Sequence, residues 1–331
     1  MTGLSAILER KPPLSGASRF EPGRDLRAVI SLLQDGFQDE LEERDRRWLD
    51  EMGGLSAAGP LLSFVMKVFP PAAAGLAGYV WHEDGVLVAN ASLMRSTEDV
   101  WQVANVVTHP DHRRRGIGRR LMGAVIDDAR RRGARQLQLQ VRTDNEAGQT
   151  LYGDLGFRRL QATAKFRLRD ASAAVRLSEP ARGFAVVEWG RGEAHMVRRL
   201  LTRAGEDGAA THPGLVRVAS RRSDARSMFD DWLRMNRHFR FAAVEAGSYR
   251  GVAVARSSER EPMHLLDVVA DPLWRGRVEA PLINAALIQL ARQAPREVQA
   301  EIDDREIGAE SALRRAGFRH VRTLDRLALD L

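Results

Sequence analysis

One short stretch of the chain carries glycines and arginines at a spacing suited to binding phosphate. Residues 106–120 read Val-Val-Thr-His-Pro-Asp-His-Arg-Arg-Arg-Gly-Ile-Gly-Arg-Arg, an apolar strand and a proline turn followed by the pattern Arg-x-x-Gly-x-Gly. Such a loop can present several backbone N–H groups and a helix N-terminus to one pyrophosphate. A Cβ at Gly116 or Gly118 would hold the phosphate away from the backbone. The stretch therefore predicts a site for a phosphate-bearing ligand.

The bulk composition is that of a folded protein with an anionic partner. The 331 residues suffice for two domains of ordinary size, and 44% of them are hydrophobic and 29% charged. The net charge of +7 favours an anionic ligand. The absence of cysteine excludes disulfides, thiolate metal sites and a covalent thiol intermediate.

The N-terminal residues lack the pattern of a signal peptide, and we expect a cytoplasmic protein that does not enter a membrane. The longest apolar stretch, Gly59–Trp81, is interrupted by Lys67, Pro70 and Pro71, which argues against a membrane span.

The chain contains an internal repeat. Val106–Pro110 recurs as Val268–Pro272 at an offset of 162 residues, and Leu155–Arg158 recurs as Ala316–Arg319 at an offset of 161. A nearly constant offset over several elements indicates two copies of one domain.

The first copy alternates strands and helices. Its strands alternate apolar and polar residues, its helices repeat apolar residues every three to four positions, and glycines end two of the helices. The expected elements are a strand at Ser18–Glu21, helices at Leu26–Phe37 and Gln38–Met52, a hairpin of Leu76–His82 and Val86–Leu93, a strand at Val100–Thr108, a helix at Gly116–Arg132, a strand at Leu137–Val141, a helix at Glu146–Asp154 and a closing strand at Ala164–Leu168.

The second copy follows the same order with fewer clear signals. We expect a linker at 170–183, which is rich in Ala, Ser, Pro and Arg, and hence domains at 1–169 and 184–331. The expected elements are a strand at Phe184–Trp189, a hairpin of Arg240–Ala246 and Gly251–Arg256, a helix at Leu282–Arg292 and a closing strand at Asp325–Leu329.

The element order and three motifs resemble the GNAT superfamily of acyl-CoA-dependent N-acetyltransferases. The motifs are the glycine loop within Val106–Leu121, the Asn-x(6)-Tyr pair of Asn145 and Tyr152, and Leu155-Gly156-Phe157. The tandem form resembles two-copy members such as mycothiol synthases. The resemblance implies an α/β (α+β) fold of two tandem GNAT-like domains, each a mixed, mostly antiparallel sheet with a central splayed parallel strand pair flanked by helices.

The resemblance also assigns the residues that would bind acetyl-CoA. The pantetheine arm would lie between the splayed strands Val106–Thr108 and Leu137–Val141, with a backbone N–H near Val107 directed at the thioester oxygen. One such donor typically contributes about 3 kcal/mol in the transition state. The full set of expected cofactor-binding residues is Val106, Val107, Thr108, Arg113, Arg114, Arg115, Gly116, Ile117, Gly118, Arg119, Asn145 and Tyr152.

The resemblance gives Tyr152 the role of general acid toward the CoA thiolate. A tyrosine pKa near 10 against a thiol pKa near 8.5 makes this transfer unfavourable by about 2 kcal/mol unless neighbours, such as the loop arginines, lower the tyrosine pKa. A general base is less clear, because Gln102, Asn105 and Gln140 stand where many relatives have glutamate. Glu98 is the nearest candidate base, and a water chain or an amine with a low pKa would serve equally.

The second copy lacks the residues of these motifs. Val278 and Ala280 replace the two loop glycines, with Glu279 between them and Pro281 after them. The tyrosine position becomes Leu313 and the asparagine position becomes Glu306. We therefore expect a non-catalytic second domain.

The sequence thus predicts an N-acetyltransferase that transfers the acetyl group of acetyl-CoA, without metal, to a primary amine by direct attack in a ternary complex. The alternative is a non-catalytic acyl-CoA-binding or regulatory module. Nucleic acid is not expected as a partner, because the Arg130–Arg132 run ends a helix and has no interleaved aromatic residues. The acceptor, a small molecule or peptide, would be shaped by Phe37–Pro71, and the chain would be a monomer or homodimer.

Overall fold

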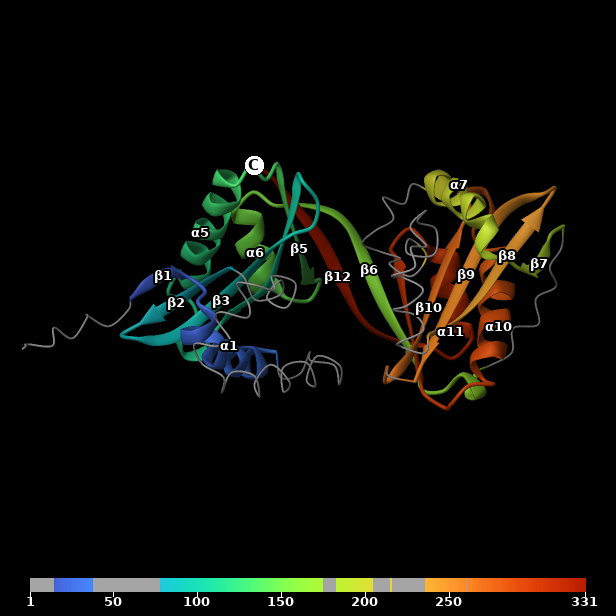
Figure 1. The fold of residues 1–331 in the computed structure, drawn as a ribbon, viewed down its shortest axis with the longest axis horizontal. Coiled ribbons are helices and arrows are strands. Elements are labelled where there is room, and N and C mark those ends of the chain that lie inside the picture. Colours follow the sequence, from blue (N-terminus) through green and yellow to red (C-terminus); the bar gives the residue numbers. More distant parts are fainter. Residues whose placement is uncertain (1–14, 38–77, 175–182, 205–214, 216–235, 260) are drawn as a thin grey trace, which may run out of the picture. The chain divides into compact units, whose positions relative to one another are not determined.

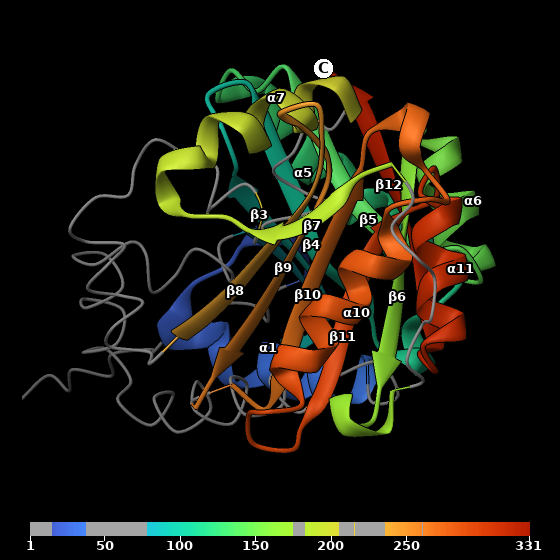
Figure 2. The same ribbon diagram turned by 90° about the vertical axis from the view of Figure 1, so that its right-hand side faces the viewer.

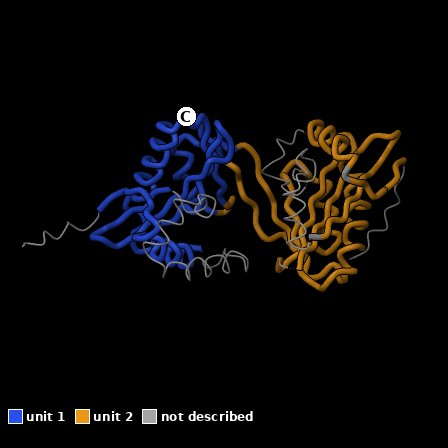
Figure 3. The backbone as a smooth tube through the Cα atoms, in the orientation of Figure 1, with its two compact units in different colours: residues 1–141, 145–159, 327–331 blue, residues 142–144, 160–326 orange. Residues whose placement is uncertain are grey.

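The computed structural model describes residues 15–37, 78–174, 183–204, 215, 236–259 and 261–331 (Figure 1). These residues form two compact units (Figure 3). Unit 1 consists of residues 1–141, 145–159 and 327–331, and unit 2 of residues 142–144 and 160–326. Among the described residues, no helix combines the length and the apolar character needed to cross a bilayer.

Unit 1 is a mixed sheet with helices on both faces. Its strands lie in the order β1-β2-β3-β4-β5-β12, with β4 and β5 parallel and the pairs from β1 to β4 antiparallel. The elements are β1 (Gly16–Arg19), α1 (Pro22–Gly36), β2 (Gly78–Glu83), β3 (Val86–Arg95), β4 (Val100–Thr108), α5 (Ile117–Arg131), β5 (Gln136–Arg142), α6 (Glu146–Asp154) and the end of β12 (Arg319–Asp330).

The apolar periodicity of the helices explains this layering. In α5, Leu121, Val125 and Ala129 recur every four residues and face one side of the sheet, where they join the same buried cluster as Leu139. In α1, Leu26 and its apolar neighbours pack on the opposite face, in a second cluster that includes Val107 of β4. The two helices therefore cover β4 from both sides.

Unit 2 repeats this plan. Its strands lie in the order β6-β11-β10-β9-β8-β7, with β10 and β11 parallel and the other neighbours antiparallel (Figure 2). The elements are β6 (Arg158–Leu168), β7 (Ala185–Glu188), α7 (Ala194–Ala204), β8 (Asn236–Glu245), β9 (Ser248–Ser258), β10 (Met263–Ala270), α10 (Glu279–Leu290), β11 (Glu297–Asp303) and α11 (Ile307–Arg315). The two plans confirm the predicted α/β class, with a central parallel pair in each copy.

The C-terminal part of the closing strand of each copy lies in the unit formed by the other copy. β6 follows the first copy but pairs with β11, and Phe166 of β6 is fully buried in the core of unit 2. The C-terminal end of β12 lies in unit 1, where the Leu331 N–H donates to the Arg135 carbonyl at 2.9 Å and Leu327 joins the core. A simple division at 169 and 184 therefore differs from the compact units.

Several expectations fall on residues outside those described. They include the second helix at Gln38–Met52 and most of the acceptor segment Phe37–Pro71. Among the described elements, β4 and α6 have the expected bounds.

The strand exchange predicts that a core substitution near the C-terminus destabilises the first copy. Leu327→Ala should lower the free energy of unfolding by about 2–5 kcal/mol through a cavity in unit 1, and Phe166→Ala should act similarly on unit 2. Hydrogen exchange read by mass spectrometry should then rise in β5 and α6 for the first variant and in β10 and β11 for the second. Loosening of unit 2 by Leu327→Ala would contradict the exchange.

Candidate active site

The glycine loop lies between the end of β4 and the start of α5. A single turn at Pro110–His112 follows β4, and α5 begins directly after Gly116. Gly116 has φ +73°, a conformation that favours glycine. Arg114 has φ +61°, which costs a residue with a side chain about 1 kcal/mol. The loop is thus held in a conformation that the local chain does not prefer.

The N-terminus of α5 has no internal cap. Gly116 offers no side-chain acceptor, and the first hydrogen bond at this end of the helix joins the Arg120 N–H to the Gly116 carbonyl. The N–H groups of Ile117 and Gly118 therefore have no acceptor among the described residues. Free N–H groups at a helix N-terminus, with the positive end of the helix dipole, favour an anion.

Gly118 is not required by the packing of the protein itself. A Cβ placed there would lie 3.5 Å from Leu151 and 3.8 Å from the Thr108 hydroxyl, which are ordinary contacts. A methyl group at Gly118 therefore fits the free protein, but it would obstruct a ligand that approaches the backbone at this position.

The four loop arginines have different partners. Arg113 donates to the Thr108 carbonyl at 3.1 Å, and Arg115 donates to the Asp111 carbonyl at 2.9 Å and lies 3.4 Å from Glu83. Arg119 forms an ion pair with Asp154 of α6. Arg114 is exposed and makes no hydrogen bond or ion pair with the described residues. All four lie at the surface beside the uncapped helix end.

The two loop histidines have structural partners. His109 Nδ1 accepts a hydrogen bond from the Asp111 N–H at 3.3 Å, which stabilises the turn, and His112 Nδ1 lies 2.7 Å from the Glu83 carboxylate. Within the described ranges, no three His, Asp or Glu side chains come together as a metal site would require.

β4 and β5 separate toward this loop. Their parallel pairing runs from Val100 opposite Gln136 to Gln102 opposite Gln138 and then ends, although both strands continue. The strands therefore open a wedge from Val103 and Leu139 onward, which includes Val106–Thr108. Backbone N–H and C=O groups that leave a ladder need other partners.

A β-bulge lies on the β3 side of the wedge. Asn90 pairs with Val107 and Ser92 pairs with Ala104, so β4 has one residue more than β3 between these pairs. Asn105, in the bulge, has φ +53°. The Asn90 side chain donates to the Asn105 carbonyl at 2.8 Å.

Tyr152 lies in α6 and is buried. It belongs to the same cluster as Leu139 and Val141 of β5 and makes an edge contact with Phe157. Burial raises the pKa of Tyr152 to about 12. The possibility that arginines lower this pKa is not realised here, because the cause of the shift is desolvation, which disfavours the phenolate.

Two other expected residues lie at the surface. Asn145 is the N-cap of α6, and its Oδ1 accepts from the Gly148 N–H at 2.9 Å. Glu98 lies exposed in the turn that precedes β4. Eight residues of extended chain, roughly 26 Å at about 3.3 Å per residue, separate it from Val106. The structure does not bring Glu98 to the wedge.

Parts of the chain are similar to known proteins. A sequence model of the Acetyltransferase (GNAT) family matches residues 33–157, which contain the loop, the wedge and Tyr152. A tandem GNAT protein from the clavulanic acid biosynthesis pathway has the same fold over 95% of this chain and 98% of that one, with a TM-score of 0.57 and 19% identity. Residues 33–157 therefore match the Acetyltransferase (GNAT) family, and the structural likeness at 19% identity shows the fold.

Curated GNAT relatives match parts of the chain. The [ribosomal protein bS18]-alanine N-acetyltransferase of Escherichia coli K12 is 43% identical over 53 residues, which are 16% of this chain and 36% of that protein. The mycothiol acetyltransferase of Thermobispora bispora is 30% identical over 159 residues, 45% of this chain and 48% of that protein. The chain spans less than half the length of each of these two relatives.

In the second copy, a side chain of the protein itself occupies the loop. The carboxylate of Glu279 is fully buried and accepts hydrogen bonds from the N–H groups of Gly276 at 2.9 Å and Val278 at 3.2 Å. Burial raises the pKa of Glu279, and the two N–H donors act in the opposite direction. A side-chain anion thus lies at the backbone donors of this loop.

The second loop is also closed by the helix that follows β11. A Cβ at Gly308 of α11 would come within 2.4 Å of the Gly276 nitrogen, so the two backbones touch. Arg275, which corresponds to Arg113, forms an ion pair with the buried Glu306 at 3.0 Å. In the first copy the position of Gly308 is Ala147, and α6 approaches α5 through the Leu151 side chain. The glycine loop is therefore open in one copy and closed in the other.

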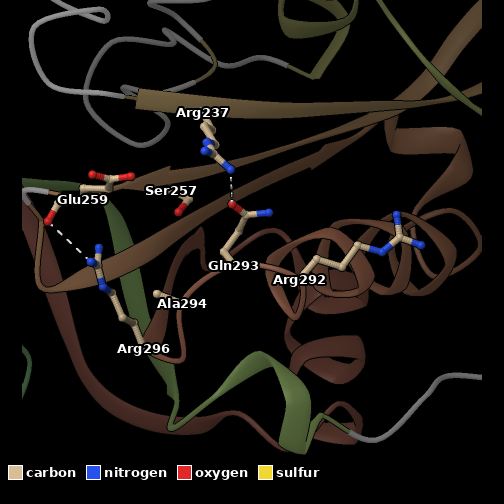
Figure 4. A pocket seen from close by; sticks show the side chains of 7 residues that line it. All are labelled: Arg237, Ser257, Glu259, Arg292, Gln293, Ala294 and Arg296. Carbon is tan, nitrogen blue, oxygen red and sulfur yellow. Dashed lines mark hydrogen bonds between the residues drawn. The ribbon is translucent and has the colours of Figure 1, made fainter.

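The second copy has a pocket of about 170 Å³ at the other end of its parallel strands (Figure 4). It is lined by Arg237, Ser257, Glu259, Arg292, Gln293, Ala294 and Arg296. Figure 4 shows Arg237 donating to Gln293 at 3.1 Å and Arg296 donating to the Glu259 carbonyl at 3.4 Å. Arg296 also donates to the carbonyls of Ser258 and Glu261. This pocket lies beside the last turn of α10, whereas a GNAT glycine loop precedes the first, so it is no counterpart of that loop.

The environment of Tyr152 predicts its titration. Because burial raises its pKa to about 12, the phenolate should appear well above pH 10. The ultraviolet difference between the wild type and Tyr152→Phe, followed as the pH rises, isolates this group among the three tyrosines of the chain. A midpoint near 10 would show that Tyr152 is solvated.

Proposed function

We propose that unit 1 transfers the acetyl group of acetyl-CoA to a primary amine by direct attack in a ternary complex. The observation that supports this most is the alignment of an open wedge, a bulged β4 and an uncapped helix N-terminus along one strand. The wedge and the helix end leave backbone donors or acceptors that a long ligand with amides at one end and phosphates at the other would satisfy.

The cofactor would extend from the wedge to the loop. The pyrophosphate would accept hydrogen bonds from the N–H groups of Ile117 and Gly118, with Arg113, Arg114 and Arg119 near it. The pantetheine amides would pair with the exposed edge of β4 at Val106–Thr108. The carbonyl of the acetyl group would then accept from an N–H near Val107 as negative charge develops on it.

In the reaction, the amine nitrogen forms a bond to the thioester carbon, the C–S bond breaks, and the nitrogen loses a proton. Tyr152 would donate a hydrogen bond to the departing sulfur. Complete transfer of its proton is unfavourable by about 5 kcal/mol, given a pKa near 12 against about 8.5 for a thiol. Its contribution is therefore to stabilise the thiolate while remaining protonated.

The two wedge strands supply no carboxylate that could act as a general base. β4 and β5 contain neither Asp nor Glu. The acceptor would accordingly react as the free amine, and its proton would leave to water.

The names of the relatives indicate the general chemical class of the acceptor and not one molecule. Their names include a ribosomal-protein alanine N-acetyltransferase, an L-amino acid N-acyltransferase and a mycothiol acetyltransferase. These activities share N-acylation and differ in the molecule acylated. A panel of amines tests this class. It contains amino acids, alanine-terminated peptides and aminosugars, and acetylation of each is measured by release of the CoA thiol.

The glycine loop gives the first test. Gly118→Ala should weaken acetyl-CoA binding at least 10-fold in calorimetry, because the methyl group fits the free protein but obstructs a phosphate at the backbone. Gly123→Ala in the same helix, where a Cβ meets nothing within 4 Å, is the matched control and should bind as the wild type does. Equal affinity for both variants would place the cofactor elsewhere, and no binding by the wild type would overturn the proposed function.

Tyr152 gives the second test. Tyr152→Phe should lower kcat by about 10- to 100-fold with little change in the KM for acetyl-CoA, as expected for a hydrogen bond formed in the transition state. The wild-type rate should rise with pH toward the pKa of the amine and show no decline from Tyr152 below about pH 11, since its pKa is raised to about 12. An unchanged kcat would exclude Tyr152 from the chemistry.

A further inference from the structure

The bulge in β4 is held by a small polar cluster on β3. Asn90 donates through Nδ2 to the Asn105 carbonyl at 2.8 Å and lies 3.4 Å from the Ser92 hydroxyl. Asn105 Nδ2 in turn donates to the Ser92 hydroxyl at 3.2 Å. Asn90 and Ser92 are 1% and 0% exposed, so these contacts form away from water. The cluster thus fixes the residue that precedes Val106 and Val107.

The second copy shows the same strands without the cluster. The Asp84-Gly85 turn corresponds to Ala246-Gly247, at the offset of 162, so Asn90 and Ser92 correspond to Val252 and Val254. There β9 pairs with β10 in an unbroken register, from Gly251 opposite Ala270 to Arg256 opposite Leu265. The polar residues and the bulge therefore occur together in the open copy and are absent together from the closed one.

Asn90 is a costly residue at this position. Its Oδ1 is buried and has no hydrogen-bond partner within the described part of the chain. A buried polar atom without a partner typically costs about 1–3 kcal/mol, whereas a valine at the same place would bury apolar surface. Stability alone would favour valine, the residue that the second copy has.

We propose that Asn90 is a positioning residue for acetyl transfer. By holding the Asn105 carbonyl, its side-chain amide keeps the bulge in place and so fixes the backbone N–H near Val107 that would face the acetyl group. This inference rests on the proposed function, because it assigns Asn90 to the same reaction. Asn90 acts through the backbone of β4 and is not a catalytic residue.

The substitution Asn90→Val, which copies the second domain, tests the proposal. We expect kcat to fall by about 10- to 100-fold, the range for a displaced oxyanion donor, while calorimetry gives an affinity for CoA within threefold of the wild type. The melting temperature should stay within about 4 °C, since the loss of one hydrogen bond is offset by removal of the unpartnered oxygen. Val252→Thr, which buries a hydroxyl at the corresponding place in unit 2, should lower stability and leave kcat unchanged.

A second variant has a readout that a purely structural role would not alter. The carboxylate of Asn90→Asp cannot donate to the Asn105 carbonyl, but its protonated form can. Burial raises the pKa of such a carboxyl, so the rate relative to the wild type at each pH should rise as the pH falls. A ratio independent of pH would overturn the proposal.

The outcomes separate this inference from the proposed function. A wild type that binds no acetyl-CoA or acetylates no amine would overturn both. An active wild type with an Asn90→Val variant that retains its kcat would overturn the role of Asn90 alone. A loss of kcat in proportion to a lost folded fraction would likewise assign Asn90 to stability only.

Discussion

The separation of β4 from β5 is the constraint on which the site depends. A parallel ladder satisfies its backbone groups, and after Gln102 and Gln138 this ladder ends while both strands continue. The uncapped start of α5 extends the same condition beyond β4, since the N–H groups of Ile117 and Gly118 have no acceptor among the described residues. Such groups are available to a ligand that supplies partners.

The two copies show both ways of meeting this constraint. In unit 2 the parallel ladder ends at Leu266 opposite Ala300, which by the repeat offset is two residues further along β10, and β10 has no bulge. There Glu279 occupies the loop donors, and the contact between Gly308 and Gly276 closes the loop against α11. Unit 1 lacks these internal substitutes. The two copies thus distinguish residues required for the fold from residues required for binding a ligand.

Much of this could be predicted from the sequence, because periodicity and repeats are local signals. The bounds of β4 and α6, the glycine loop at Gly116 and the altered second loop can be recognised from residues a few positions apart. The exchange of β6 and β12 could not be predicted, since either closing strand has the same alternating pattern and would fit either sheet. Truncation at the linker would therefore remove a strand from each unit.

The chemistry of the site was less predictable than its location. Glu98 is near β4 in sequence but at the wrong end of the strand, and the pKa of Tyr152 depends on burial that spacing does not reveal. The Asn90 cluster joins residues up to 15 positions apart whose contact requires the bulge. Its sequence signal was the replacement of alternating valines by Asn and Ser on a buried strand.

Hydrogen exchange of the full chain with and without acetyl-CoA tests the central claim most directly. The account predicts that acetyl-CoA slows exchange at residues 103–119 and 145–152 and leaves 265–281 and 306–313 unchanged. Protection of the second loop at 275–281, or none at 116–119, would contradict it.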